Sequence, residues 1–128
     1  MRMQEARVIK ALFKELLRAP LEPFPLPRRS LIAPVEPGVY VIYGRTGMVL
    51  HVGRTSRGRL GLRQRLKDHL HCASSFSIEY LKRDASRLRN GCKYRCLVVK
   101  NSRRRALLEA LAIGCLCPAH IGLGDAII

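Results

Sequence analysis

The 128-residue sequence is poor in several features that define common protein classes. It has no tryptophan and only nine acidic residues, and no apolar run approaches the length of about 18 residues that a membrane span needs. The charged N-terminal stretch MRMQEARVIKALFKELLRA lacks the apolar core of a secretory signal. The five cysteines are an odd number, which argues against a disulfide framework. We therefore expect a cytoplasmic protein with reduced cysteines and no membrane partner.

Positive charge dominates the composition. Lysine and arginine total 24 against nine aspartate and glutamate residues, which gives a formal net charge of +15. Arginine supplies 18 of the 24, and its planar guanidinium group pairs with two phosphate oxygens at once. Because the arginines are spread along the whole chain, they favour a nucleic-acid partner over a membrane surface. A solvated basic face that only keeps the protein soluble is the alternative.

The N-terminal part of the chain differs in pattern from the rest. Residues 4–18 carry apolar side chains at helical spacing, which predicts an amphipathic helix. Residues 19–38 hold six of the seven prolines and predict a stiff, extended connector. We therefore expect residues 1–34 to form a helix and linker appended to a domain of residues 35–128, outside its continuous core. This helical arm is a candidate surface for a homodimer, for another protein partner or for DNA.

From residue 38 onward the sequence predicts short strands and helices within one domain. Three segments rich in β-branched residues and tyrosine predict strands, namely VYVIY, VLHVG and KYRCLVVK. Three segments with helical spacing or capping residues predict helices, namely LGLRQRLKDHL, SIEYLKRDASRLR and RRRALLEALAIGCL. GRTGM between the first two strands predicts a turn. The predicted order is β-β-α-α-β-α, an α/β chain of the α+β type.

One acidic residue stands out as a candidate for chemistry. Hydrolysis of a phosphodiester bond requires a base, a cation for the phosphate and usually a metal ion on a carboxylate. Beyond the linker the sequence has only five acidic residues, and ordinary surface pairing explains Asp68, Glu79 and Asp84. Glu109 differs, because apolar residues surround it in ALLEALAIGCL and burying an unpaired acid costs free energy. A place on the polar stripe of its helix is the alternative.

The predicted hairpin supplies candidate bases. If Tyr43 pairs with Met48 around a four-residue loop, Tyr40 lies directly opposite His51 with the Cβ atoms about 5 Å apart. Taken singly, each is more often a packing residue of a strand. As a pair beside an arginine-rich helix start, they are candidate site residues. Gly53 leaves room for a ligand or a backbone to approach closely.

The order of these motifs resembles a known family. GVY at residues 38–40, followed about ten residues later by HVG at residues 51–53, resembles the paired motifs of the GIY-YIG nuclease superfamily. The resemblance continues with Arg65 in RQRLKDHL and Glu109 in LLEALAIGCLCP, and it covers roughly residues 35–121. Each tripeptide alone is weak, whereas the motifs together are specific. The resemblance implies a single-domain member with a small three-stranded antiparallel sheet flanked by helices.

For function, the resemblance implies a divalent-metal-dependent endonuclease that hydrolyses DNA by a one-metal mechanism. Glu109 would bind the ion, Mg²⁺ or Mn²⁺. Tyr40 would help to deprotonate the attacking water, and Arg65 would hold the phosphate, with 5′-phosphate and 3′-hydroxyl ends as products. A catalytically inactive nucleic-acid-binding module on the same fold is the alternative, and a purely structural basic protein is a more distant one.

Two positions depart from the family pattern. His51 stands where the family has the tyrosine of its second motif. The unperturbed pKa of histidine is about 6.5 and that of tyrosine about 10, so His51 is expected to be the better base at neutral pH. A loss of activity is the other interpretation. His120 is the nearest substitute for an asparagine that the family carries after its proline.

Several arginines are candidates for binding substrate phosphates. Arg54 follows HVG, where the family often carries a basic residue. The stretch RTSRGRLG is longer than in compact family members, which leaves both Arg63 and Arg65 as candidates for the phosphate-binding arginine. Besides the four candidate catalytic residues, substrate binding is predicted for Gly53, Arg54, Arg57, Arg63 and His120.

The cysteines do not predict a zinc site. Structural zinc sites usually carry pairs of ligands two to four residues apart on turns. Cys96 instead lies in a predicted strand and Cys115 in a predicted helix, where free cysteine behaves as a small apolar residue. The nearby His69, His71 and Cys72 do not improve the spacing.

Overall fold

The computed structural model describes residues 2–56 and 61–121. Arg57, predicted above to bind substrate, lies outside these described residues. None of the helices in the two segments is long and apolar enough to cross a membrane. The elements are α1 (Arg2–Arg18), β1 (Glu22–Pro23), β2 (Gly38–Tyr43), β3 (Val49–Arg54), α2 (Leu62–Leu70), the π-helical turn η1 (Phe76–Tyr80), α3 (Ser86–Arg89), β4 (Lys93–Val98) and α4 (Ser102–Leu116).

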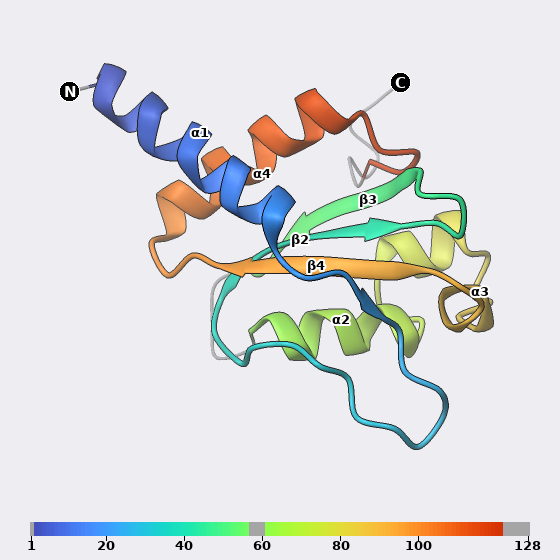
Figure 1. Ribbon diagram of the computed structural model, residues 1–128. Coiled ribbons are helices and arrows are strands. Elements are labelled where there is room, and N and C mark those ends of the chain that lie inside the picture. The colour runs from blue at the N-terminus through green and yellow to red at the C-terminus, as the bar shows by residue number, and fades with distance from the viewer. Residues whose placement is uncertain (1, 57–60, 122–128) are drawn as a thin grey trace.

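The strands form one antiparallel sheet in the order β1-β4-β2-β3 (Figure 1). The predicted antiparallel sheet flanked by helices is confirmed, but the predicted count of three strands is wrong. The fourth strand, β1, lies in the proline-rich segment, where Glu22 pairs with Tyr94 and Pro23 with Lys93 of β4. Proline is tolerated there because β1 is an edge strand, whose outer side needs no N–H donor.

The predicted helix SIEYLKRDASRLR is interrupted. The turn η1 and the short α3 replace it, so the predicted β-β-α-α-β-α order holds only when the two are counted together. Between them, Lys82 and Arg83 have φ angles of 53° and 64°, a left-handed conformation that a right-handed helix does not contain. Leu81 and Leu88 are both buried, and the bend allows both short segments to turn an apolar side chain to the core.

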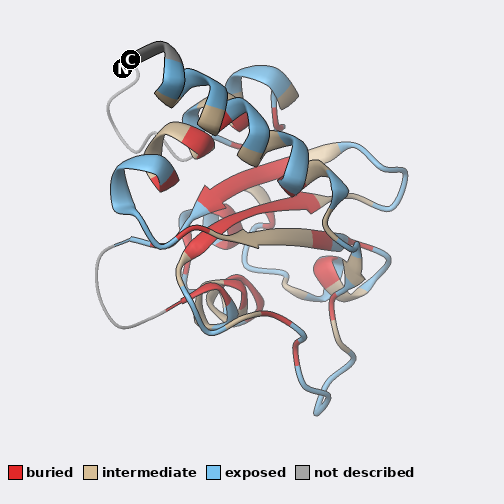
Figure 2. Cartoon of the chain, turned by 60° about the vertical axis from the view of Figure 1, so that its left-hand side comes forward, coloured by how far each residue is buried: buried red, intermediate tan, exposed pale blue. Residues whose placement is uncertain are grey.

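The sheet separates two apolar cores. In β2, Val39 and Val41 pack in the core shared with α1 and α4, whereas Tyr40 and Ile42 pack in the core shared with α2, because side chains alternate along a strand. In Figure 1, α1 and α4 lie on one face of the sheet and α2 lies on the other. Figure 2 shows that buried residues concentrate in the strands and on the helix sides that face them. The fold therefore has three layers with the sheet in the middle.

Helix α1 belongs to one of these cores. Leu16 is fully buried at 0% exposure and Ile9 is 6% exposed, and both pack with residues of the sheet and of α4. Arg95 of β4 also donates a hydrogen bond to the carbonyl of Leu17. The interpretation of this helix as an arm outside the core is therefore wrong, because the second face of the sheet supplies the apolar surface that an amphipathic helix needs. A division of the chain at residue 34 and a partner for the exposed side of α1 stay predictions.

Candidate active site

The hairpin of β2 and β3 places the first candidate residues. Tyr40 pairs with Gly53 and Ile42 pairs with His51, with a bulge before Tyr43. The predicted pairing of Tyr40 with His51 is therefore wrong by two residues. A shift of two keeps every side chain on the same face, so Tyr40 and His51 remain neighbours, with ring centroids 6.0 Å apart.

Tyr40 occupies the space above Gly53. Its side chain is fully buried, and a Cβ atom added at Gly53 would come within 2.3 Å of the Tyr40 hydroxyl oxygen. Real Cβ atoms do not approach a ring so closely, so a larger residue at position 53 displaces Tyr40. The room that Gly53 leaves is thus taken by the tyrosine rather than by a ligand.

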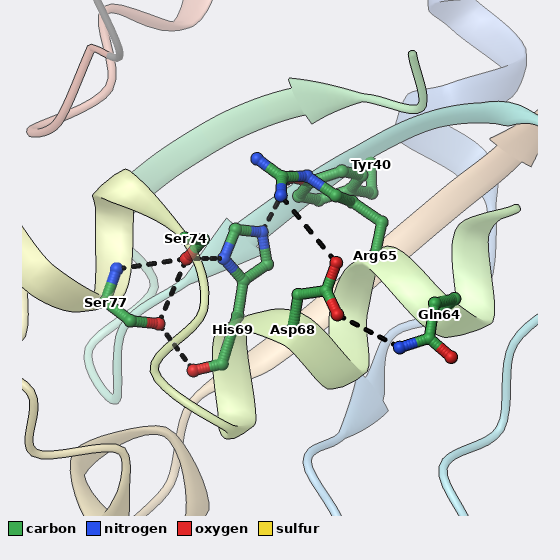
Figure 3. Close-up of polar contacts among 7 residues, drawn as sticks. All are labelled: Tyr40, Gln64, Arg65, Asp68, His69, Ser74 and Ser77. Atoms are coloured by element: carbon green, nitrogen blue, oxygen red, sulfur yellow. Dashed lines mark hydrogen bonds and ion pairs between the residues drawn. The ribbon is translucent and has the colours of Figure 1, made fainter. Parts of the chain in front are cut away.

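The Tyr40 hydroxyl group meets a histidine from α2. Its oxygen lies 2.6 Å from Nε2 of His69, and Nδ1 of His69 lies 2.6 Å from the Ser74 hydroxyl oxygen (Figure 3). His69 is itself fully buried. His69 is not among the site residues predicted from the sequence, although it lies four positions after Arg65 and hence on the same side of the helix. That spacing is the signal by which it could have been found.

The protons of this network can be assigned by counting. Ser77 donates its only hydroxyl proton to the His69 carbonyl oxygen, so Ser74 donates its own to Ser77. Nδ1 of His69 must then carry a proton and donate it to Ser74, which leaves a lone pair on Nε2. Tyr40 therefore donates its hydroxyl proton to His69, and its oxygen, which also accepts a hydrogen bond from Arg65, keeps one lone pair available to accept a proton.

Burial keeps this pair neutral. It raises the pKa of Tyr40 far above the ordinary value for tyrosine, and the positive charge of Arg65 only partly opposes it. Burial also lowers the pKa of His69 to about 2, and the charges of His51 and Arg65 lower it further. At neutral pH the site therefore holds a phenol and an uncharged imidazole.

A second hydrogen-bonded chain leads to His51. Its Nδ1 lies 3.1 Å from Nδ1 of His120, and Nε2 of His120 lies 2.9 Å from the Glu79 carboxylate. The backbone holds His120 in place, because its N–H donates to the carbonyl of Leu50 in β3 at 2.8 Å. When His120 is neutral, it donates to Glu79 and accepts from His51, so Nε2 of His51 carries a lone pair. That nitrogen makes no hydrogen bond within the described residues.

His51 is a weaker base than the sequence analysis expects. It is buried and its ring stacks on Phe76, with centroids 4.7 Å apart. Burial lowers its pKa to about 3, and the charge of His120 acts in the same direction. The expectation that His51 is the better base rests on the pKa of a solvated histidine and is therefore wrong for the buried ring.

The structure distinguishes the two candidate arginines of α2. Arg65 acts through its charge on the pKa values of Tyr40, His51 and Glu109, and Figure 3 shows its guanidinium group beside Tyr40. It also lies 3.9 Å from the Asp68 carboxylate. Arg63 instead donates from Nε to a backbone carbonyl of the proline-rich segment at 3.0 Å. Arg65 faces the candidate site, and Arg63 does not.

Glu109 approaches from the opposite side of the sheet. It lies on α4, its side chain is 24% exposed, and Oε1 accepts a hydrogen bond from Nε of Arg54 at 3.1 Å. Burial raises the pKa of Glu109, while Arg54 and Arg65 lower it. Arg105, one turn earlier on α4, is buried and donates to the Thr55 carbonyl oxygen at 3.1 Å. This bond fixes the end of β3 against the helix that carries Glu109.

Similarity to solved structures identifies the fold of the chain. No family model and no curated protein matches the sequence. The structure is similar to the GIY-YIG N-terminal endonuclease domain of UvrC from Thermotoga maritima bound to its catalytic divalent cation, magnesium, with 28% sequence identity, a TM-score of 0.51, and coverage of 70% of this chain and 86% of that chain. A point mutant of that domain, also bound to its catalytic divalent cation, gives 28% identity, a TM-score of 0.50 and the same coverage. The chain has a GIY-YIG-like fold.

In this GIY-YIG-like fold the candidate residues gather around one edge of the sheet. β3 is an edge strand, so α2 on one face and α4 on the other can both present side chains at its border. Tyr40, Arg65 and Glu109 lie close enough there for their charges to act on one another's pKa values. His51, His120 and Arg54 join them, whereas Arg63 lies apart.

The described residues of the GIY-YIG-like fold offer few side chains that could bind a metal ion. Within residues 2–56 and 61–121, no group of three or more histidine, cysteine, aspartate or glutamate side chains is placed to hold a metal ion. Glu109 and Asp68 both act electrostatically on Tyr40 and Arg65, but Asp68 is already hydrogen-bonded to Gln64 and paired with Arg65 on α2. Mg²⁺ is usually held by one or two carboxylates, several waters and substrate phosphates, so a single carboxylate here fits Mg²⁺ better than a metal that needs a full protein cage.

Proposed function

We propose that the protein is a divalent-metal-dependent endonuclease that hydrolyses DNA phosphodiester bonds at the β3 edge. The observation that carries this proposal is the convergence of Tyr40, Arg65 and Glu109 from β2, α2 and α4. They are a hydroxyl group with one free lone pair, a cation suited to phosphate and a partly buried carboxylate, which are the groups that the reaction needs. The GIY-YIG-like fold and the endonuclease domain to which it is similar support the proposal. A cytoplasmic location belongs to the same proposal.

Glu109 is the residue that we expect to hold the metal ion, Mg²⁺ or Mn²⁺. Its carboxylate is partly desolvated and is paired with Arg54, whose side chain is 41% exposed and free to move toward solvent. Oxygen ligands of this kind suit both ions. Bound there, the ion would stabilise negative charge on the phosphate and make the attacking water more acidic.

Tyr40 and His69 provide a path for the proton of the attacking water. The water oxygen forms the new bond to phosphorus while its proton passes to the Tyr40 oxygen. Tyr40 at the same time gives its own proton to Nε2 of His69, 2.6 Å away. The bond between phosphorus and the 3′-oxygen breaks, and the 3′-oxygen takes up a proton from solvent, which leaves 5′-phosphate and 3′-hydroxyl ends.

Substrate binding strengthens these bases. Burial lowers the pKa values of His69 and His51, to about 2 and about 3. A phosphate held by Arg65 brings negative charge close to both rings, and nearby negative charge favours the imidazolium form. Proton uptake is therefore coupled to the presence of the substrate.

His51 is the second candidate base. With Glu79 and His120 behind it, its Nε2 lone pair faces away from the hydrogen-bonded chain. The chain stabilises a proton on His51 in the way that a carboxylate orients and supports a catalytic histidine. His120 is then a positioning residue rather than a group that contacts the substrate.

A cleavage assay tests the proposal. Duplex, nicked, flapped and branched DNA are incubated with Mg²⁺ or Mn²⁺, and nicking is followed on gels. We expect activity in the native protein, its loss in Glu109→Ala, and a decrease on the order of 10²–10⁴-fold in Tyr40→Phe, because Tyr40→Phe removes the proton acceptor.

Matched variants separate chemistry from folding. Glu15→Ala removes an exposed acid from α1, and Tyr43→Phe removes a hydroxyl group from the other face of β2, so both should cleave like the native protein. Equal activity of the native protein, Glu109→Ala and Tyr40→Phe would contradict the mechanism. Salt-sensitive DNA binding without cleavage by any divalent ion would identify the inactive binding module instead.

A further inference from the structure

A basic pocket lies on the far side of α2 from the candidate site. Its volume is about 610 Å³, and it is lined by the loop between β1 and β2, by α2 and by the end of α3. Six lining residues are positively charged or can become so: Arg28, Arg29, Arg63, Lys67, His71 and Arg89. No acidic residue lines it. Figure 1 shows the loop running beside α2 on the sheet face opposite α1 and α4.

The positive charge of the basic pocket is not neutralised within the described residues. None of the five lysine and arginine side chains forms an ion pair with a described acid. Arg63 and Arg89 are held by hydrogen bonds from Nε to the carbonyls of Ala33 and Pro25, at 3.0 and 3.1 Å. These bonds leave the Nη groups for another acceptor. Like charges gathered in a concave surface repel each other and raise the local concentration of anions.

The loop also holds Arg28 in an unfavourable backbone conformation. Arg28 has a φ angle of 71°, in the left-handed region that non-glycine residues seldom adopt. A hydrogen bond from the N–H of Arg29 to the carbonyl of Leu26, 3.0 Å long, closes the turn. Both arginines are exposed. Backbone strain of this kind is often found at sites that bind a ligand.

We propose that the basic pocket binds backbone phosphates of a nucleic acid, as a second contact apart from the scissile phosphate. Four of its five permanent cations are arginines, whose forked donors match phosphate oxygens. A concave pocket suits a phosphate chain better than the flat surface of a membrane. The inference deepens the proposed nuclease function and rests on it for the choice of nucleic acid.

Helix α2 connects this contact with the candidate site. Successive residues of a helix turn by about 100°, so Arg63 and Lys67 lie on one flank while Arg65 and His69 lie on the other. The motif resemblance begins at about residue 35, and the loop with Arg28 and Arg29 precedes it. The proline-rich segment thus adds a phosphate-binding wall to the GIY-YIG-like fold.

A salt titration of DNA binding tests the pocket. The double variant Arg28→Gln/Arg29→Gln keeps the side-chain length, removes two charges and breaks no described hydrogen bond or ion pair of these side chains. Binding of a fluorescent DNA duplex is measured by anisotropy without divalent metal, so that no cleavage occurs. We expect weaker binding and a slope of log affinity against log salt that is smaller by about 0.9 for each lost phosphate contact. Lys67→Gln, on the α2 wall, should act in the same direction.

The control removes equal charge elsewhere. Arg45 in the β2–β3 turn and Lys93 at the start of β4 are exposed and do not line the pocket, and Arg45→Gln/Lys93→Gln should leave the slope unchanged. An unchanged slope in the pocket variants, or an equal decrease in this control, would overturn the pocket. The proposal would also be overturned if the pocket variants lost binding to phosphatidylserine vesicles but still bound DNA like the native protein. Because this test measures binding and not cleavage, its result can be interpreted even if the protein proves not to be a nuclease.

Discussion

At the scale of single residues, the site is built around histidines that burial keeps uncharged. His51 and His69 have pKa values lowered to about 3 and about 2, first because of desolvation. Their ring centroids lie 5.3 Å apart, so two protonated rings would also repel each other. In the folded protein, His51 and His69 therefore stay unprotonated at pH values at which the same histidines are protonated in the unfolded chain.

This difference in protonation predicts how stability depends on pH. Between the unfolded pKa of about 6.5 and the lowered folded values, the unfolded state binds more protons, so the free energy of unfolding falls as pH falls. Each histidine contributes a slope of about 1.4 kcal/mol per pH unit. Urea unfolding between pH 7 and pH 4 should show this loss, and His51→Gln should reduce the slope. Ala11, which is exposed on α1, provides the control Ala11→Gln, which removes no titratable group and should leave the slope unchanged. A pH-independent stability would show that the buried rings titrate normally.

At the scale of elements, the edge strand β3 organises the site. Its backbone brings Gly53 under Tyr40 and Arg54 beside Glu109. The first half of the strand is covered by the segment after α4, where Ala119 and His120 donate to carbonyls of β3. The second half is left beside α2 and α4, where the site forms.

Two glycine substitutions should act in opposite directions. Gly53→Ala forces the Tyr40 ring away from its position, and overpacking of this kind costs about 1–3 kcal/mol. Gly114→Ala meets no atom within 4 Å inside α4 and should stabilise the helix by about 0.5–1 kcal/mol. Thermal unfolding measures both, and the cleavage assay should show lost activity only for Gly53→Ala. A neutral Gly53→Ala would contradict the packing of Tyr40 on β3.

Some of these elements follow from local patterns and others do not. Strand and helix periodicity predicts β2, β3, β4, α2 and α4, and the motif spacing selects Tyr40, Arg65 and Glu109. The hairpin register depends on a bulge that no residue type requires, and β1 depends on pairing with a distant strand. His69 escaped selection because its role comes from Ser74, Ser77 and Tyr40 around it, contacts that helical spacing alone does not specify.

At the scale of the whole molecule, α1 stabilises the face of the sheet that does not carry Tyr40. Leu16 and Ile9 pack with Val99 and Leu108 in the core of that face. Exposure of this core would leave an apolar surface on a strongly basic protein. Stability and site geometry are therefore linked through α4, which contacts α1 and carries Glu109.

A truncation in this core tests the link. Leu16→Ala should lower the free energy of unfolding by about 2–5 kcal/mol, as expected for a fully buried leucine. Lys14→Ala, at an exposed position of the same helix, should change it by less than about 0.5 kcal/mol. Urea unfolding followed by circular dichroism distinguishes them. Equal stability of both variants would restore the interpretation of α1 as a separate arm.

The covering of the sheet edges limits how copies of this chain can associate. One edge, β1, spans only Glu22–Pro23, and proline supplies no N–H for a neighbouring strand. At the other edge, residues 119 and 120 already use the carbonyls at the start of β3. Within the described residues, β1 covers Lys93 and Tyr94 of β4 and residues 119–120 cover the start of β3, so only short stretches of each edge remain for strand addition. A sheet continued from one copy of this chain into another would therefore rest on only a few backbone hydrogen bonds at each edge.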